Sequence, residues 1–205
     1  MHSVVADAAA GLLFTSSLGP SDCAARVWRL WDPRGMPGSN GGSSRLLQPA
    51  LAHTLSGHTA PVLSLALSPD RRLLFTGSHD YTIRVWSTAD WHCVRVLKGH
   101  GGGVRALVVA PDGATLYSAA ADNTIRVFQT GGGGGRDAGD CLATFAQLGY
   151  RDKGGISALL FSPDARTLYS GASDGTLAAW HLRWSEPAAA GAGGSTAGGL
   201  RRGFL

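Results

Sequence analysis

The chain has 205 residues, of which 44% are hydrophobic and 16% charged, a profile that fits one substantial folded domain and not a disordered chain. Its net charge is +4, from 18 basic and 14 acidic side chains, and the scattered basic residues form no run or stripe of the kind that binds nucleic acid. Three cysteines without a C-x-x-C pair suggest neither a disulfide scaffold nor a zinc finger, so a reducing compartment, cytoplasmic or nuclear, fits best.

The N-terminal segment is apolar, but it has neither the basic start of a signal peptide nor an uninterrupted apolar stretch, because Asp7 lies inside it. We expect a first strand from Val4 onward. No run in the chain approaches the roughly 18 apolar residues of a membrane span, so no membrane association is predicted.

Short strands follow one another along the chain, most clearly between residues 56 and 98. Each candidate strand has four to six β-branched, leucine or aromatic residues, and proline followed by aspartate, as in "SPDRR", supplies a turn between the first two. No amphipathic helix is evident. The predicted strands of this segment are 62–67, 73–77, 82–86 and 93–97.

The same order of residues recurs, with an aspartate before the third strand of each copy and an aromatic residue six positions later. The step between successive aspartates is 42 residues in the best-matched pair and 52 or 58 elsewhere. The surplus falls in loops rich in glycine, where insertions cost little. The anchors are Asp22, Asp80, Asp122 and Asp174, each followed by Trp28, Trp86, Phe128 or Trp180.

Four antiparallel strands per period of about 42 residues is the arrangement of a β-propeller blade. The Gly-His pairs Gly57-His58 and Gly99-His100, the proline-aspartate turns, "TGSHD" and "TIRVW" resemble WD40 repeats. The resemblance covers residues 4 to about 182. We therefore predict an all-β fold with about four blades in an open or partial propeller, at 1–55, 56–98, 99–150 and 151–182, followed by a flexible Gly/Ala-rich tail at 183–205.

The WD40 resemblance implies a hydrogen-bonded tetrad inside a blade, made by the Gly-His histidine, a hydroxyl on the second strand, the turn aspartate and the third-strand tryptophan. The second copy supplies all four residues. The third has a phenylalanine without an N-H to donate, the fourth has Asp152 in place of the histidine, and the first has no matching histidine. The predicted members are His58, Thr76, Asp80, Trp86, His100, Ser118, Asp122, Phe128, Ser170, Asp174, Trp180, Asp22 and Trp28.

The same side chains contain the ingredients of a hydrolase triad, which is the competing interpretation. A nucleophilic serine or threonine needs an exposed hydroxyl near an oxyanion hole, and the sequence offers no strained elbow such as G-x-S-x-G. A pattern that recurs at a fixed period marks a structural unit instead. We therefore predict no catalytic residue, no metal site and no cofactor.

As the resemblance implies, the function is that of a non-catalytic scaffold that binds other proteins within a larger assembly. Further propeller blades, from the same or another chain, are possible partners, because the chain ends after a third-type strand and leaves blade four with an unpaired edge and blade one with an uncovered apolar face. The loop residues expected to contact a partner are Thr59, His79, Tyr81, Asn123 and Arg151, with Tyr81 as the anchor.

Two alternative functions remain open. RNA or ribonucleoprotein binding is suggested by the isoelectric point of 9.3 and by Arg84, Arg105 and Arg126. The segment "WDPR" at 31–34 echoes the W-D-x-R ending with which some WD40 proteins bind a cullin ligase adaptor, although it lies out of register with the third strand.

Overall fold

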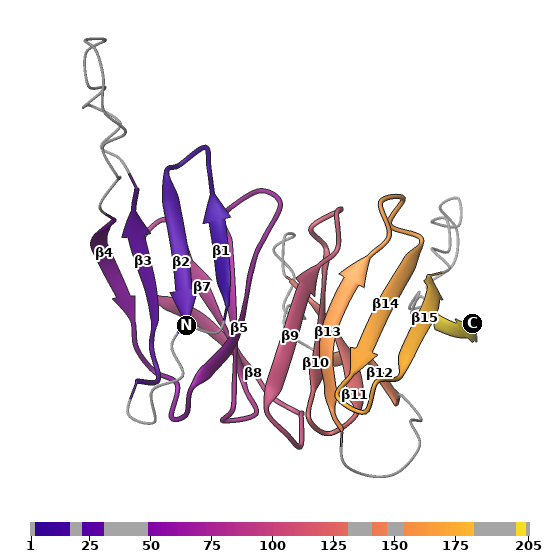
Figure 1. Ribbon diagram of the computed structural model, residues 1–205. Helices are drawn as coiled ribbons and strands as arrows, with labels where there is room; N and C mark the ends of the chain where they lie inside the picture. The colour runs from indigo at the N-terminus through magenta and orange to yellow at the C-terminus, as the bar shows by residue number, and fades with distance from the viewer. Residues whose placement is uncertain are drawn as a thin grey trace, which may run out of the picture.

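In the computed structural model, four antiparallel sheets follow one another along the chain, each made of four strands in sequence order. The structure describes residues 3–16, 22–30, 49–130, 141–146, 154–182 and 200–203. These residues contain strands and turns but no helix. The predicted all-β fold of about four WD40-type blades is confirmed, and we call the sheets blades one to four (Figure 1).

The first blade begins with the N-terminal strand expected at Val4. The predicted strands of blade two agree with the observed ones to within one residue at each end. Blade one contains β1 (Val4–Asp7), β2 (Leu12–Ser16), β3 (Ala25–Arg29) and β4 (Ala50–Leu55), and blade two contains β5 (Val62–Leu67), β6 (Leu73–Ser78), β7 (Ile83–Ser87) and β8 (Cys93–Leu97).

The last two blades repeat this order with the same register. Blade three contains β9 (Val104–Val109), β10 (Thr115–Ala120), β11 (Thr124–Gln129) and β12 (Cys141–Ala146), and blade four contains β13 (Ile156–Phe161), β14 (Thr167–Ala172), β15 (Leu177–Leu182) and β16 (Leu200–Gly203). Leu74 pairs with Trp86 in blade two, as Leu116 pairs with Phe128 in blade three. Residues at equivalent positions of the repeat therefore have their side chains on the same face of each blade.

The fourth strand of blade four corrects one expectation. The sequence predicts an unpaired edge at the end of the third strand, but β16 pairs antiparallel with β15, from Leu182 opposite Leu200 to Ala179 opposite Gly203. This strand is only four residues long and follows a Gly/Ala-rich stretch, so it has no recognisable hydrophobic pattern.

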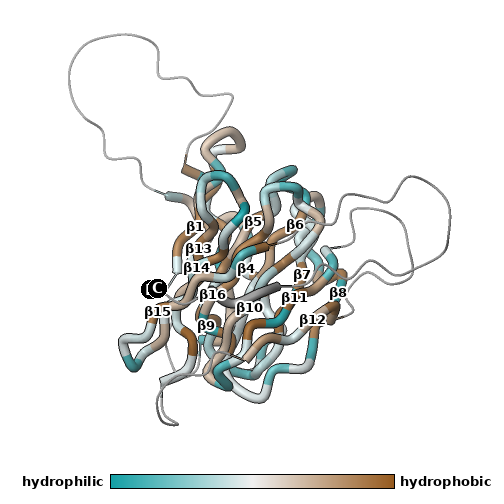
Figure 2. The backbone as a smooth tube through the Cα atoms, turned by 90° about the vertical axis from the view of Figure 1, so that its right-hand side faces the viewer, coloured by the Kyte–Doolittle hydropathy of each residue, from teal (hydrophilic) through white to brown (hydrophobic). Residues whose placement is uncertain are grey.

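Apolar side chains are buried between successive blades and form three clusters. Phe14 of blade one packs with Trp86 of blade two, Phe75 of blade two with Leu116 of blade three, and Tyr117 of blade three with the next blade. Figure 2 shows the corresponding pattern, with hydrophobic strands and hydrophilic connecting turns. Each cluster is shared by neighbouring blades only, so the four blades form an open series and not a closed ring.

The end blades differ from the inner ones in the faces that they leave uncovered. In the view of Figure 1, blades one and four lie at opposite sides of the molecule, with strands of blades two and three between them. Across the described residues, no helix is both long and apolar enough to cross a membrane.

Candidate functional site

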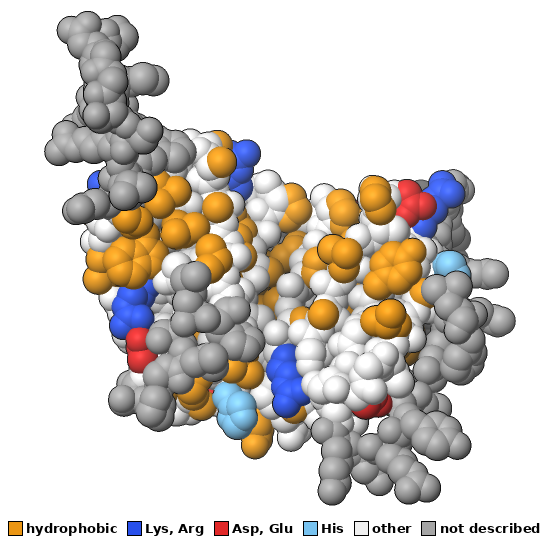
Figure 3. Space-filling model, viewed as in Figure 1, with side chains coloured by type: hydrophobic (Ala, Val, Ile, Leu, Met, Phe, Trp, Pro, Cys, Tyr) orange, Lys and Arg blue, Asp and Glu red, His pale blue; other side chains and the backbone are white. Residues whose placement is uncertain are grey.

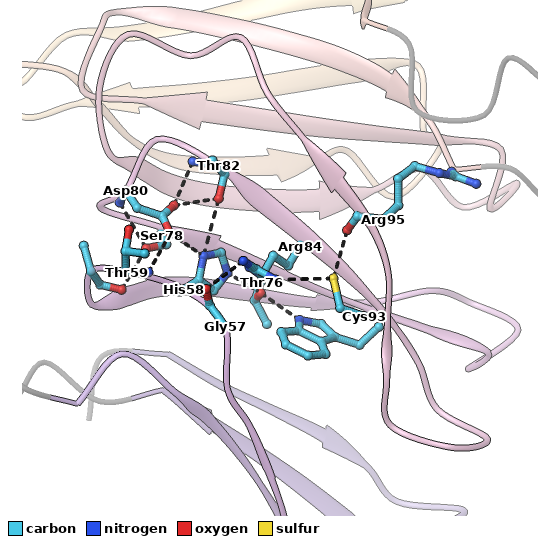
Figure 4. Close-up of polar contacts among 12 residues, drawn as sticks. Gly57, His58, Thr59, Thr76, Ser78, Asp80, Thr82, Arg84, Cys93 and Arg95 are labelled. Carbon is cyan, nitrogen blue, oxygen red and sulfur yellow. Dashed lines mark hydrogen bonds and ion pairs between the residues drawn. The ribbon is translucent and has the colours of Figure 1, made fainter.

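The four predicted tetrad residues of blade two lie in one chain of hydrogen bonds (Figure 4). His58 Nδ1 is 2.8 Å from Asp80 Oδ2, and His58 Nε2 is 2.7 Å from Thr76 Oγ1. The Trp86 indole N-H donates to the same Thr76 oxygen over 2.9 Å. The carboxylate fixes the tautomer with the proton on Nδ1, so Nε2 accepts from the threonine hydroxyl and each group has a partner.

The electrostatics of this network keep Asp80 charged and His58 neutral. Burial alone would raise the pKa of Asp80, but hydrogen bonds from Thr82, His58 and Thr59 outweigh it and lower the pKa from 3.8 to about 2. Burial is the main reason that the pKa of His58 falls below 6.5, although the hydrogen bond with Asp80 opposes the shift and Arg84 adds to it. The pair therefore has one full charge, which belongs to the aspartate.

Blade three has the same arrangement with one member changed. His100 Nδ1 is 3.0 Å from Asp122 Oδ2, and His100 Nε2 is 2.8 Å from Ser118 Oγ. Burial opposes the shift, but hydrogen bonds from His100 and Thr124 bring the pKa of Asp122 well below 3.8. Phe128 occupies the tryptophan position and is fully buried, so no indole N-H reaches Ser118.

In the end blades, the described residues show the tryptophan half of the network. In blade four the Trp180 indole donates to Ser170 Oγ at 2.8 Å, and Asp174 is exposed. Asp152, the residue in the histidine position, lies outside the described residues. In blade one the Trp28 indole donates to Thr15 Oγ1 at 2.8 Å, while Asp22 accepts from Arg26 at 2.7 Å.

Thr15 is missing from the sequence prediction, because the hydroxyl was placed by counting four residues back from the aspartate. In blade one the turn between β2 and β3 is longer, so this count gives Leu18 instead. Counting along the paired strands finds the right residue, since Thr15 pairs with Arg26 as Thr76 pairs with Arg84.

The sequence suggests RNA binding for the third-strand arginines Arg84 and Arg126, but it does not indicate that they contact the Gly-His segment. Arg84 donates from Nη2 to the Gly57 carbonyl oxygen at 2.7 Å, and a Cβ on Gly57 would come within 2.7 Å of Arg84 Nη1. Gly99 and Arg126 repeat this close approach at 2.8 Å. Both glycines have positive φ, of 148° and 134°. The arginine recurs at this position in blades one, two and three, but blade one has it without a Gly-His pair, so the recurrence alone does not identify the contact.

A threonine two residues after the aspartate is a further contact that recurs. Thr82, Thr124 and Thr176 each donate both the backbone N-H and the side-chain hydroxyl to Oδ1 of their aspartate. In blades two and three the other carboxylate oxygen accepts from the histidine and from the next backbone N-H. Each carboxylate thus joins two turns at one end of its blade.

This geometry does not favour nucleophilic chemistry. Thr76 and Ser118 have no exposed surface, so a substrate cannot reach either hydroxyl. The Thr76 oxygen is also occupied by the imidazole and the indole. Among the described residues, no group of three or more His, Cys, Asp or Glu side chains is placed to hold a metal ion.

The residues predicted to contact a partner lie at the turns that the aspartates organise. Thr59, His79 and Tyr81 are exposed around Asp80, and the rings of His79 and Tyr81 are 6.2 Å apart. Asn123 is partly buried at the equivalent turn of blade three. Arg151 lies outside the described residues, as does the "WDPR" segment at 31–34.

The arginines that suggested RNA binding contact the protein itself. Arg84 donates to Gly57, as described above, and Arg105 donates from Nη1 to the Gly154 carbonyl oxygen at 3.0 Å and to Ser173 Oγ at 3.1 Å. Arg126 Nη1 is 3.7 Å from Cys141 Sγ. Each of these guanidinium groups thus has at least one contact within the protein.

Comparison with known families finds the model described as "WD domain, G-beta repeat" at residues 50–87, 91–129 and 139–181. These three segments make up more than half of the chain. They contain the last strand of blade one, most of blades two and three, and the first three strands of blade four.

Individual proteins match over shorter segments. The chain is 46% identical over 44 residues to transcription initiation factor TFIID subunit 5 of Drosophila melanogaster, a match covering 22% of the chain and 6% of that protein. It is 39% identical over 70 residues to transducin beta-like protein 3 of Rattus norvegicus, covering 34% and 8%, and 53% identical over 38 residues to COMPASS component SWD3 of Saccharomyces cerevisiae, covering 18% and 12%. The chain thus matches only a small part of each relative's length.

Proposed function

The chain belongs to the WD40 family, and we propose that it is a non-catalytic scaffold that binds another protein through the aspartate turns of blades two and three. We propose that the buried hydrogen-bond networks stabilise the blades and hold these turns rigid. Two comparisons support an interaction role, since matched relatives are named as a TFIID subunit and a COMPASS component.

The observation that carries the proposal is the backbone conformation of Tyr81. This residue has φ of 72° in a turn closed by a hydrogen bond from its N-H to the Ser78 carbonyl oxygen. The equivalent residues of the next two blades are Asn123, with φ of 61°, and Gly175, with φ of 87°. Asparagine and glycine adopt this left-handed conformation readily, whereas tyrosine adopts it at a cost of about 1 kcal/mol.

Packing among the described residues does not offset this cost, because Tyr81 is 47% exposed and its ring contacts the ring of His79. Arg71, Trp91 and Ala165 also have positive φ, and of these three only Trp91 is aromatic. The Trp91 ring contacts Phe14 and His53 of blade one and so stabilises the fold. An exposed, rigidly held tyrosine offers a large contact area at low conformational entropy cost, as binding surfaces require. We therefore assign Tyr81 to partner binding.

The test is Tyr81→Asn, which places in blade two the residue that blade three already has. We expect the variant to be more stable than the wild type by up to about 1 kcal/mol in urea unfolding, because the strain is relieved. Used as bait with the full chain, it should retain its specific partner at least about tenfold less well in quantitative mass spectrometry.

Val94→Asn is the matched control, since Val94 has a similar exposure of 45% but lies on the outer strand β8 of the same blade. It should capture the same proteins as the wild type. Equal capture by the Tyr81→Asn and wild-type baits would refute the proposed binding surface, as would the absence of any protein retained above background.

The compartment belongs to the same proposal. A relative named for transcription initiation favours the nucleus over the cytoplasm, the two compartments that the cysteine content suggests. No described contact favours RNA binding or ligase recruitment over protein binding.

A further inference from the structure

Blade four presents an apolar face that is built like the buried faces of the inner blades. Leu160, Tyr169 and Leu177 lie on this face and are 67%, 43% and 85% exposed. The strand register makes Ala66, Phe75 and Ile83 their equivalents in blade two, and these are 8%, 0% and 1% exposed because blade three covers them. We call these three residues of blade four its open face.

Blade one presents the complementary half of the same interface. Val4, Leu13, Trp28 and Leu51 share one face of its sheet through the pairings of β1 to β4, and Val4 and Leu51 are 45% and 52% exposed. In blade two the equivalents of Val4, Leu13 and Trp28 are Leu65, Leu74 and Trp86, which are buried against blade one. We call these four residues the open face of blade one.

The two open faces point the same way. Figure 3 shows hydrophobic side chains over β13–β15 on the right and over the blade-one strands on the left, both turned toward the viewer. One copy of the chain therefore displays both halves of an inter-blade contact on one side of the molecule. A second copy, turned by half a revolution about the vertical axis of that view, would set its blade one on blade four and its blade four on blade one.

From this arrangement we infer that two copies of the chain associate through these faces, with the open face of blade four packed on the open face of blade one in each of two equivalent contacts. The proposed contact between two copies repeats the three contacts that successive blades make within one chain. A soluble monomer rarely exposes apolar patches of this kind. Two heterologous contacts related by a two-fold axis close on themselves and leave no open face. The inference goes beyond the scaffold function and does not involve Tyr81.

The test is the mass of the full chain in sedimentation velocity and light scattering. We expect twice the 21.1 kDa of one chain for the wild type. Leu177→Glu and Leu51→Glu, which each place a charge on one open face, should weaken the association at least about tenfold and give monomers. Leu142→Glu is the control, because Leu142 is 46% exposed on the outer strand of blade three, away from both faces.

Mixing the two monomeric variants distinguishes the proposed contact from a contact between like faces. Each variant keeps one intact open face, and the two intact faces are complementary, so the mixture should form a dimer with one contact. A wild-type monomer at all concentrations, a dimer that Leu51→Glu or Leu177→Glu leaves intact, or a mixture that stays monomeric would each overturn the inference. Circular dichroism checks the fold, and Leu160→Glu replaces Leu177→Glu if that variant unfolds. If the wild-type chain is a monomer and still binds its partner through Tyr81, the association is refuted but the proposed scaffold function is not.

Discussion

Blades two and four have the same strand register and the same types of side chain, yet one is enclosed on both faces and the other on only one. Phe75 of blade two has no exposed surface, whereas Tyr169, at the same position of blade four, is 43% exposed. The difference arises from the neighbour and not from the blade, because blade three covers Phe75 and no described residue covers Tyr169.

The polar networks of the two blades differ in the same direction. In blade two the indole, the threonine, the imidazole and the carboxylate form a continuous chain from the sheet to the turn. In blade four the described contacts are the Trp180 indole donating to Ser170 and the Thr176 hydroxyl donating to Asp174 at an exposed turn. Of these two blades, the one enclosed on both faces has the complete network among the described residues.

The largest expected effect on stability concerns the apolar packing that distinguishes blade two from blade four. Phe75→Ala should lower the free energy of unfolding by about 3–5 kcal/mol, because it leaves a cavity between blades two and three. Tyr169→Ala, the matched change in blade four, should cost less than about 1 kcal/mol, because water already reaches that ring. Urea unfolding at a concentration low enough for monomers measures both. Equal losses would mean that the face of blade four is covered in the monomer.

The next effect concerns the hydroxyl at the centre of each network. Thr76→Val keeps the shape of the side chain but leaves the Trp86 N-H and His58 Nε2 buried without partners, so we expect a loss of about 2–3 kcal/mol. Ser170→Ala removes the acceptor of the Trp180 indole and should cost about 1–2 kcal/mol. Thermal and urea unfolding compare the two. A smaller loss for Thr76→Val than for Ser170→Ala would contradict the coupling of the indole to the histidine.

Much of the fold follows from the sequence because its signals are local and repeated. The turn residues and the alternating strands of blade two define its sheet, and the recurring aspartates set a common register for all four blades. The sequence does not reveal β16, because its pairing with β15 depends on a contact across 17 intervening residues without a hydrophobic pattern.

The candidate site shows the same limit. The order of the repeat is enough to select His58, Thr76, Asp80 and Trp86, which the structure brings into contact. Thr15 was missed because an offset counted along the chain fails where a turn is longer. The strain at Tyr81 is invisible in the sequence, since it depends on a backbone angle that only comparison with Asn123 and Gly175 makes meaningful.

A smaller effect separates the indole from the rest of the network. Trp86→Phe gives blade two the aromatic residue of blade three and should cost about 1–2 kcal/mol, from one hydrogen bond and part of the buried area. Trp180→Phe, the matched change in blade four, removes the equivalent bond to Ser170. Coupling between the Trp86 indole and the Thr76 hydroxyl, which is also bonded to His58, should add to the loss in blade two. A double-mutant cycle with Thr76→Val measures this coupling, and an interaction energy of zero would rule it out.

The smallest expected effect is a loss of stability on mild acidification, because it involves the single proton of His58. Burial lowers the pKa of His58 in the folded chain below its ordinary 6.5, so the unfolded chain binds more protons there and stability falls as the pH drops from about 6.5. The protonated ring would have an N-H at Nε2, which could no longer accept from Thr76. Asp80 affects stability only at lower pH: its pKa is about 2 in the fold against an ordinary 3.8, so its contribution to stability is present above pH 3.8 and is lost as the pH falls toward 2.

Because of His58, the melting temperature should decline between about pH 7.5 and pH 5.5, and His58→Gln should flatten this decline while lowering stability throughout. His92→Gln, which removes an imidazole that is 62% exposed, should leave the slope unchanged, and a slope that His58→Gln does not alter would show that the acid sensitivity lies elsewhere.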